Sequence, residues 1–383
     1  MAHAAPGPAV DDVVRGRALS QGPAQPARRV WLDWARGVAV VLMVLAHVVD
    51  AWTREADRDR DAYYWTTFVG GLAAPAFLFL AGLGTALSGA SKRRAGQSRG
   101  AVTRALMARG ATIFGLAFVF RAQALALGWG RPIDFLKVDI LNVMGPALVV
   151  AALLWGAAAG AVGRVVAGVS ATVALAMAAP IIRAGRWIDA LPEPLQWYWR
   201  PTPGHTNFTL VPWSAFVFAG VAAGAALAAA GGERGERRLQ MTLAGLAVAV
   251  GAAAWWASLQ PTIYPPGLSS FWGASPTFFF LRLAIVMALL PVAWSLRHVL
   301  PAAVAQPLAT IGAASLFAYW VHVELVYGGI AIPLKRRLPL EVTLPATLLV
   351  SYGLARLVPW TRRWVAAIDE PPVRVKRLVA RLL

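Results

Sequence analysis

The chain has 383 residues, of which 58% are hydrophobic and only 14% are charged, and its formal net charge is +18. This balance excludes an ordinary soluble globular domain, in which about 25% of the residues are charged. The chain contains no cysteine, which excludes disulfides, thiolate metal sites and a cysteine nucleophile. His, Ser, Asp or Glu must therefore supply any general-base or covalent chemistry.

Residues 1–27 precede the first apolar segment and are rich in Ala, Pro and Gly, so we predict a disordered tail there. Each apolar window that follows approaches the roughly 20 residues that cross the hydrocarbon core of a bilayer. The windows cover residues 31–50, 66–90, 104–127, 138–160, 163–182, 208–230, 240–260, 276–297, 308–331 and 340–361. We therefore predict an all-α fold, a polytopic membrane bundle of about ten transmembrane helices over residues 28–363, with a basic tail at 364–383.

The basic residues lie at the ends of these windows and in short loops, and no soluble basic domain interrupts them. This distribution is typical of a membrane protein that follows the positive-inside rule, and it argues against a nucleic-acid partner. Lys92, Arg93 and Arg94 belong to the more basic side, whereas most acidic residues fall in loops of the other side. We predict an integral, multi-pass protein with both termini in the cytoplasm.

Ionisable side chains inside the hydrocarbon cost several kcal/mol, so they usually face an interior cavity. Arg36 and His47 are about three helical turns apart in the first window, which places them on one face and about 16 Å apart along the axis. Arg36 is then near the cytoplasmic mouth, and His47 and Asp50 lie toward the outer leaflet.

The same alternating topology places further polar residues near this outer level: Arg121, Asp139, Asn142, His205, Asn207, Arg282, His322 and Glu324. Two other interpretations stay open. These side chains could extend to the interface without a shared site, and His322 could be a core histidine bonded to a backbone carbonyl. His205 lies in a loop, and no role is assigned to it.

Three arginines are expected near the cytoplasmic opening, within the first turns of their helices: Arg36, Arg104 and Arg109. Topology control is a sufficient explanation for the loop cations. For these three we also consider phosphate binding, because a guanidinium group binds phosphate oxygens bidentately.

The segment RVWLDWARGVAVVLMVLAH at 29–47 resembles the opening helix of the heparan-alpha-glucosaminide N-acetyltransferase catalytic-domain family, and of membrane acyltransferases more widely. These enzymes share a Leu-Asp-x-x-Arg-Gly start. Softer agreement comes from the segments at 71–82, 138–142, 207–213 and 315–324. The likeness spans most of the chain.

The resemblance implies transfer of an acyl group from cytosolic acetyl-CoA, or another acyl-CoA, to an acceptor on the far side of the membrane. The donor would lie in a channel, with its phosphates on the inner arginines Arg36, Arg104 and Arg109, and with Arg121 also near it. No metal is expected.

On this hypothesis His47 is the general base, and Asp50 or Glu324 fixes its tautomer. Asn142 or Arg121 stabilises the oxyanion. His322 is the reserve base.

One departure concerns the acceptor. The resemblance to the eukaryotic branch of the family implies a histidine in the first outer loop, and this sequence has no histidine between His47 and His205. The composition suggests a GC-rich bacterium, so an envelope sugar or glycan at the inner membrane is favoured as acceptor. A transporter or exporter and a non-catalytic scaffold remain alternatives, and a homo-oligomer stays open.

Overall fold

The computed structural model describes residues 29–127 and 131–367. The predicted tail at 1–27, and residues 368–383 of the predicted C-terminal tail, lie outside these ranges. The described residues from Trp31 onward form one compact unit. Within the described ranges the backbone is helical, with two isolated bridges, Thr53 to Leu338 and Val138 to Thr206, and no β-strand.

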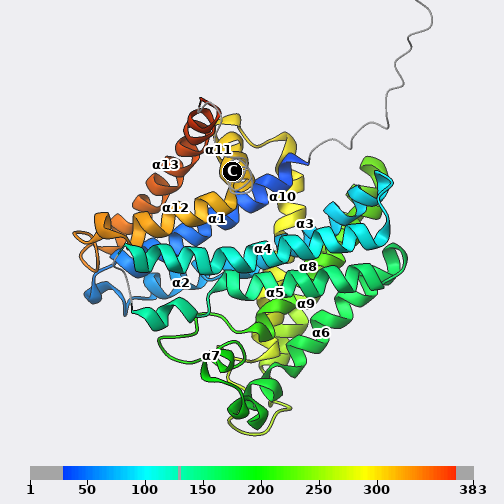
Figure 1. Cartoon of the computed structure of the whole chain (residues 1–383), viewed down its shortest axis with the longest axis horizontal. Coiled ribbons are helices and arrows are strands. Elements are labelled where there is room, and N and C mark those ends of the chain that lie inside the picture. Colours follow the sequence, from blue (N-terminus) through cyan, green and yellow to red (C-terminus); the bar gives the residue numbers. More distant parts are fainter. Residues whose placement is uncertain (1–28, 128–130, 368–383) are drawn as a thin grey trace, which may run out of the picture. The chain divides into compact units, whose positions relative to one another are not determined.

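The elements follow one another as short and long helices (Figure 1). In chain order they are α1 (Val30–Trp52), η2 (Glu55–Asp57), α2 (Asp61–Gly70), α3 (Ala73–Arg94), α4 (Arg99–Ala126), η3 (Pro132–Leu136), α5 (Ile140–Ala157), α6 (Gly160–Ala184), η4 (Arg186–Ala190), α7 (Glu193–Gln196), α8 (Leu210–Ala229), α9 (Gly232–Ser258), α10 (Pro276–Ser295), η5 (Leu296–His298), α11 (Ala302–Ala313), α12 (Ser315–Tyr327), η6 (Gly329–Ala331) and α13 (Leu340–Ala367).

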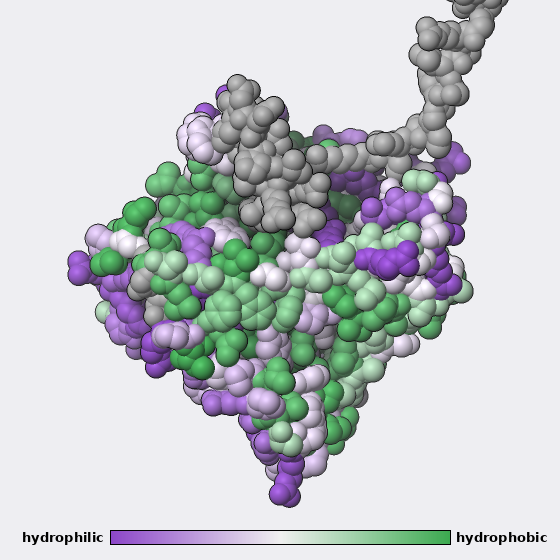
Figure 2. Space-filling model, in the orientation of Figure 1, coloured by the Kyte–Doolittle hydropathy of each residue, from purple (hydrophilic) through white to green (hydrophobic). Residues whose placement is uncertain are grey.

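Nine helices of the described ranges are long and apolar enough to cross a membrane, or ten if the bent pair α11 and α12 forms one span. The protein is therefore an integral, multi-pass membrane protein, and the predicted all-α bundle is confirmed. Figure 2 shows hydrophobic side chains over much of one face, between hydrophilic groups at its left and right margins.

Two predicted windows contain a break. The window at 308–331 is bent by 91° at Ala314, which separates α11 from α12. The window at 66–90 starts earlier, because α2 begins at Asp61 and leads into α3 through Gly71 and Leu72. The hydropathy of a window reports its length and apolarity, and a bend changes neither, so hydropathy does not predict these breaks.

Small residues let the central helices approach closely. Gly220 and Gly224 are four residues apart on α8, and a Cβ atom on either would overlap backbone atoms of α3. On α3, a Cβ atom on Gly82 would likewise overlap the carbonyl of Val217. Membrane helices associate by such close packing, since lipid tails remove the hydrophobic driving force.

The start of α1 packs against the helix preceding the bend. A Cβ atom on Gly37 would overlap the carbonyl of Leu308, and one on Gly312 would overlap the carbonyl of Asp33. The C-terminal end of α1 is fixed as well, since the backbone N–H of Arg54 donates to the carbonyl of Leu338 at 2.8 Å. These contacts hold α11 and the segment before α13 beside α1.

Candidate active site

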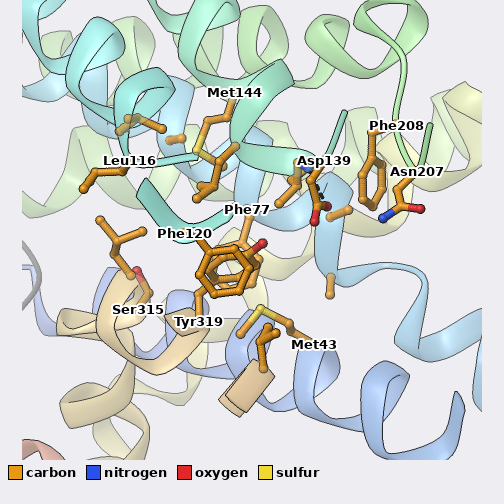
Figure 3. A pocket seen from close by; sticks show the side chains of 18 of the residues that line it. Met43, Phe77, Leu116, Phe120, Asp139, Met144, Asn207, Phe208, Ser315 and Tyr319 are labelled. Atoms are coloured by element: carbon orange, nitrogen blue, oxygen red, sulfur yellow. Dashed lines mark hydrogen bonds between the residues drawn. The ribbon is translucent and has the colours of Figure 1, made fainter. Parts of the chain in front are cut away.

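A cavity of about 1320 Å³ lies among the helices and is lined by residues of α1, α2, α3, α4, α5, α8, α10, α11 and α12. Its volume exceeds the range of about 300–1000 Å³ that is usual for drug-sized ligands. Figure 3 shows Phe120 and Tyr319 at its centre, with Asp139 and Asn207 on one side and Leu116 on the other.

One face of α4 forms a wall of this cavity. Arg109, Leu116 and Phe120 line it, together with Ile113, at spacings of three, four and seven residues that keep side chains on one face of a helix. The rise from Arg109 to Phe120 is about 16 Å. The wall is therefore charged at one end and apolar along most of its length.

At the other end, His47 of α1 meets His322 of α12. Nδ1 of His47 and Nε2 of His322 are 2.6 Å apart, and the two rings lie within 2° of parallel. His47 lines the cavity, whereas His322 is completely buried behind it. The structure thus brings together the two histidines that the sequence offered as separate candidates.

The hydrogen bonds of His322 determine which nitrogen atoms carry protons. Nδ1 of His322 lies 2.9 Å from the carbonyl of Ala318, and because a carbonyl only accepts, this nitrogen carries the hydrogen. In the neutral ring Nε2 of His322 is then an acceptor, so Nδ1 of His47 must donate to it. Nε2 of a neutral His47 therefore has a free lone pair, which is the form that a general base requires.

Neither Asp50 nor Glu324 is hydrogen-bonded to His47, so His322 occupies the orienting position expected for one of them. Asp50 is exposed and accepts a hydrogen bond of 3.0 Å from the hydroxyl of Tyr327. The Tyr327 ring contacts the His47 ring edge-on, with centroids 5.5 Å apart. Asp50 is thus linked to His47 through Tyr327.

Glu324 lines the cavity within a polar chain from α4. It accepts a hydrogen bond of 3.0 Å from the side-chain amide of Gln123, whose oxygen accepts one of 2.7 Å from the indole of Trp320. Gln123 was missed in the sequence, although an amide inside an apolar span is a recognisable signal.

Arg121 and Asp139 form an ion pair of 2.9 Å on the cavity wall. Asn142 is 1% exposed and is absent from this wall. Its Oδ1 atom accepts from the backbone N–H of Asp139 at 3.1 Å, which completes the capping box at the start of α5. Of the two expected oxyanion donors, Arg121 therefore lies at the cavity and Asn142 shapes the helix end behind it.

Arg36 and Arg109 line the charged end of the cavity. Arg36 donates to buried Asp33 at 3.1 Å, whereas Arg109 makes no ion pair within the described ranges. Arg104 is exposed and does not line the cavity. Two of the three inner arginines are therefore brought to one site.

In the described part of the chain, no group of three or more His, Asp or Glu residues could hold a metal ion. Arg121 and Asp139 of the cavity wall pair with each other instead. The arrangement can position a general base at one end and bind an anion at the other.

The family model described as heparan-alpha-glucosaminide N-acetyltransferase, catalytic, matches residues 28–264, which is more than half of the chain. No curated protein matches the chain. The matched segment contains His47 and both cavity arginines of the charged end, and it stops before His322.

Proposed function

The chain belongs to the heparan-alpha-glucosaminide N-acetyltransferase catalytic family, and from this membership we propose that it transfers an acetyl or similar group from cytosolic acyl-CoA to an extracytoplasmic acceptor. The acceptor is a sugar or glycan of the cell envelope, and the membrane is the inner membrane of a bacterium. The observation that carries the proposal is that one cavity joins two cationic arginines to a histidine pair.

The cavity suits a long donor with a charged tail. Arg36 and Arg109 can bind phosphate oxygens of coenzyme A through bidentate hydrogen bonds. Between them and His47 the wall is apolar, and its length of about 16 Å is comparable with the arm that joins the phosphates to the thioester. The acyl carbon would then lie near Nε2 of His47.

His47 would act on the acceptor. Nε2 takes the proton of the attacking hydroxyl or amine as the new bond to the acyl carbon forms, and the carbon–sulfur bond then breaks. The same nitrogen returns the proton to the departing sulfur, so protons and electrons balance. The cation of Arg121 at the cavity wall can stabilise the oxyanion formed in between.

A transfer assay tests the proposal. The full chain in nanodiscs is mixed with radiolabelled acetyl-CoA and an envelope extract, and label in the extract is counted. His47→Ala should lower the rate by a factor of about 100 or more, since a positioned general base contributes about that much. His298→Ala is the matched control, because His298 is exposed and lies outside the cavity. Equal rates for wild type and His47→Ala would refute the proposal.

The bend between α11 and α12 favours a transporter or exporter as the second candidate, because broken helices commonly form transport sites. Proteoliposomes decide between the two candidates. Movement of labelled substrate across the bilayer in the absence of any acyl donor would support transport, and donor-dependent labelling without such movement would support transfer.

A further inference from the structure

Arg282 of α10 is a cation inside a membrane span, and it has no anionic partner among the residues that the structure describes. It lines the same cavity, and it forms no hydrogen bond or ion pair with any residue of the described ranges. Its Nε atom is buried and unbonded. The guanidinium carbon lies 3.9 Å from the centroid of the Phe278 ring and 5.7 Å from that of Trp213.

An unpaired charge inside a membrane span costs free energy, and ionisable side chains there usually pair with another group or mark a binding site. Arg121, another cation of the cavity wall, is neutralised by its ion pair with Asp139. Contacts with aromatic faces compensate only part of the lost hydration. Arg282 therefore offers an unused set of donors to an anion that enters the cavity.

The position of Arg282 along the cavity follows from its neighbours. A Cβ atom on Gly71 would lie 3.9 Å from Nη2 of Arg282, and one on the adjacent Gly70 would lie 2.9 Å from Ala46. Ala46 directly precedes His47 in α1. Arg282 therefore lies at the level of the histidine pair, about three helical turns from Arg36.

The surrounding walls suit a sugar ring. Trp213, Phe208 and Trp272 present aromatic rings to the cavity, and Asn207 adds a side-chain amide. Figure 3 shows Asn207 and Phe208 next to Asp139. Flat apolar surfaces with a few polar groups are typical of small-molecule sites.

We propose that Arg282 binds an anionic group of the acceptor, a carboxylate or phosphate carried by a sugar, and so places that sugar beside His47. The proposal rests on the proposed function, which makes the ligand at this end an acceptor. Bidentate hydrogen bonds from the guanidinium group would fix the sugar against the aromatic walls. The acceptor is then an acidic sugar.

A binding experiment without acyl donor tests the anion site by itself. The full chain in phosphatidylcholine nanodiscs is titrated calorimetrically with methyl glucuronide, glucose 6-phosphate and the neutral methyl glucoside. Wild type should bind at least one anionic probe about tenfold more tightly than the neutral one, since hydrogen bonds to charged groups are worth that much. Equal affinity for all three probes would overturn the proposal.

Three variants assign the effect to the side chain. Arg282→Gln should remove the preference for the anionic probe, and Arg282→Lys should retain part of it, which also separates loss of charge from loss of fold. Arg356→Gln is the matched control, because Arg356 is an exposed arginine of α13 that lies outside the cavity. A preference that survives in Arg282→Gln would place the anion elsewhere and refute the proposal.

Lipid phosphate is the other source of an anion, and a second set of nanodiscs containing phosphatidylglycerol distinguishes it. Loss of anionic-sugar binding in these nanodiscs would show that Arg282 holds a headgroup, which contradicts the proposal. Unchanged binding supports a sugar ligand.

Failure of the anion site and failure of the acyltransferase have different signatures. Binding of the anionic probe through Arg282 without transfer of label from acetyl-CoA would refute the transfer and support the anion site. Equal transfer to charged and neutral probes, unaffected by Arg282→Gln, would support the transfer and refute the anion site.

Discussion

Nδ1 of His47 lies 2.6 Å from Nε2 of His322, although 275 positions separate the two residues in the chain. The carbonyl of Ala318 accepts from the far side of His322, so the two rings form one directed chain of hydrogen bonds. This chain leaves a lone pair on the nitrogen of His47 that is available to the cavity. His322 is therefore a positioning residue for His47.

The first prediction concerns this positioning role. His322→Phe removes the acceptor for Nδ1 of His47, and we expect kcat to fall about 10- to 100-fold while the KM for acetyl-CoA stays constant. His322→Gln supplies an amide oxygen that can accept the same hydrogen bond, so it should recover part of the rate. Steady-state kinetics of purified variants measure both values. If His322→Phe and His322→Gln lose activity equally, the tautomer argument is wrong.

The second prediction concerns the charged end of the cavity. Arg36→Gln and Arg109→Gln should each raise the KM for acetyl-CoA about tenfold, because each removes charge-assisted hydrogen bonds to phosphate. Arg104→Gln is the internal control, since Arg104 belongs to the same helix as Arg109 but does not line the cavity. A larger effect at Arg104 than at Arg109 would move the donor site out of the cavity.

The third prediction concerns helix packing. Gly37→Ala forces a Cβ atom into the carbonyl of Leu308, so the free energy of unfolding should fall by about 1–3 kcal/mol. Gly245→Ala is the matched control on α9, because its Cβ atom would meet no atom within 4 Å. Thermal unfolding in detergent compares the two. A stable Gly37→Ala variant would mean that α1 and α11 can separate at little cost.

The fourth prediction concerns pH. Hydrogen bonds from the Arg54 guanidinium and from the backbone N–H of Leu340 lower the pKa of Asp57, which lies in the loop after α1. Because this pKa is depressed in the folded protein, the stabilisation is fully present above the ordinary carboxyl pKa of 3.8. It is lost as the pH falls below 3.8 through the folded value.

Melting temperatures measured from pH 6 down to pH 3 should therefore decline less steeply for Asp57→Asn than for wild type. Asp59→Asn serves as the control, because Asp59 is an exposed carboxyl of the same loop. Identical slopes for Asp57→Asn and wild type would indicate that the loop is held by other contacts.

Much of the fold could be predicted from hydropathy, because the bilayer demands long apolar helices whatever their order. The exceptions are informative. The bend at Ala314 leaves the mean apolarity of its window unchanged, and it lies two residues after Gly312, which packs closely against α1. Such a contact joins distant parts of the chain, so the hydropathy pattern of a single window cannot predict it.

The site could be predicted only along single helices. Helical spacing alone places Arg36 and His47 on one face, and both line the cavity. Distances between helices were not accessible in this way. Sequence reasoning therefore expected Asp50 or Glu324 beside His47, whereas the structure places His322 there. Sequence reasoning also could not tell that Arg109 lines the cavity and Arg104 does not.

The cavity wall is contributed by both halves of the chain, and this has a practical consequence for dissection of the protein. The segment that defines the family ends at residue 264, whereas α10 and α12 supply Arg282, Glu324 and Tyr327 to the wall and His322 behind it. A fragment cut after residue 264 would keep the histidine of α1 but expose it sideways to lipid acyl chains, with no partner for its Nδ1–H. Expression of residues 28–264 alone would thus yield a helix bundle whose cavity is open to the bilayer on one side.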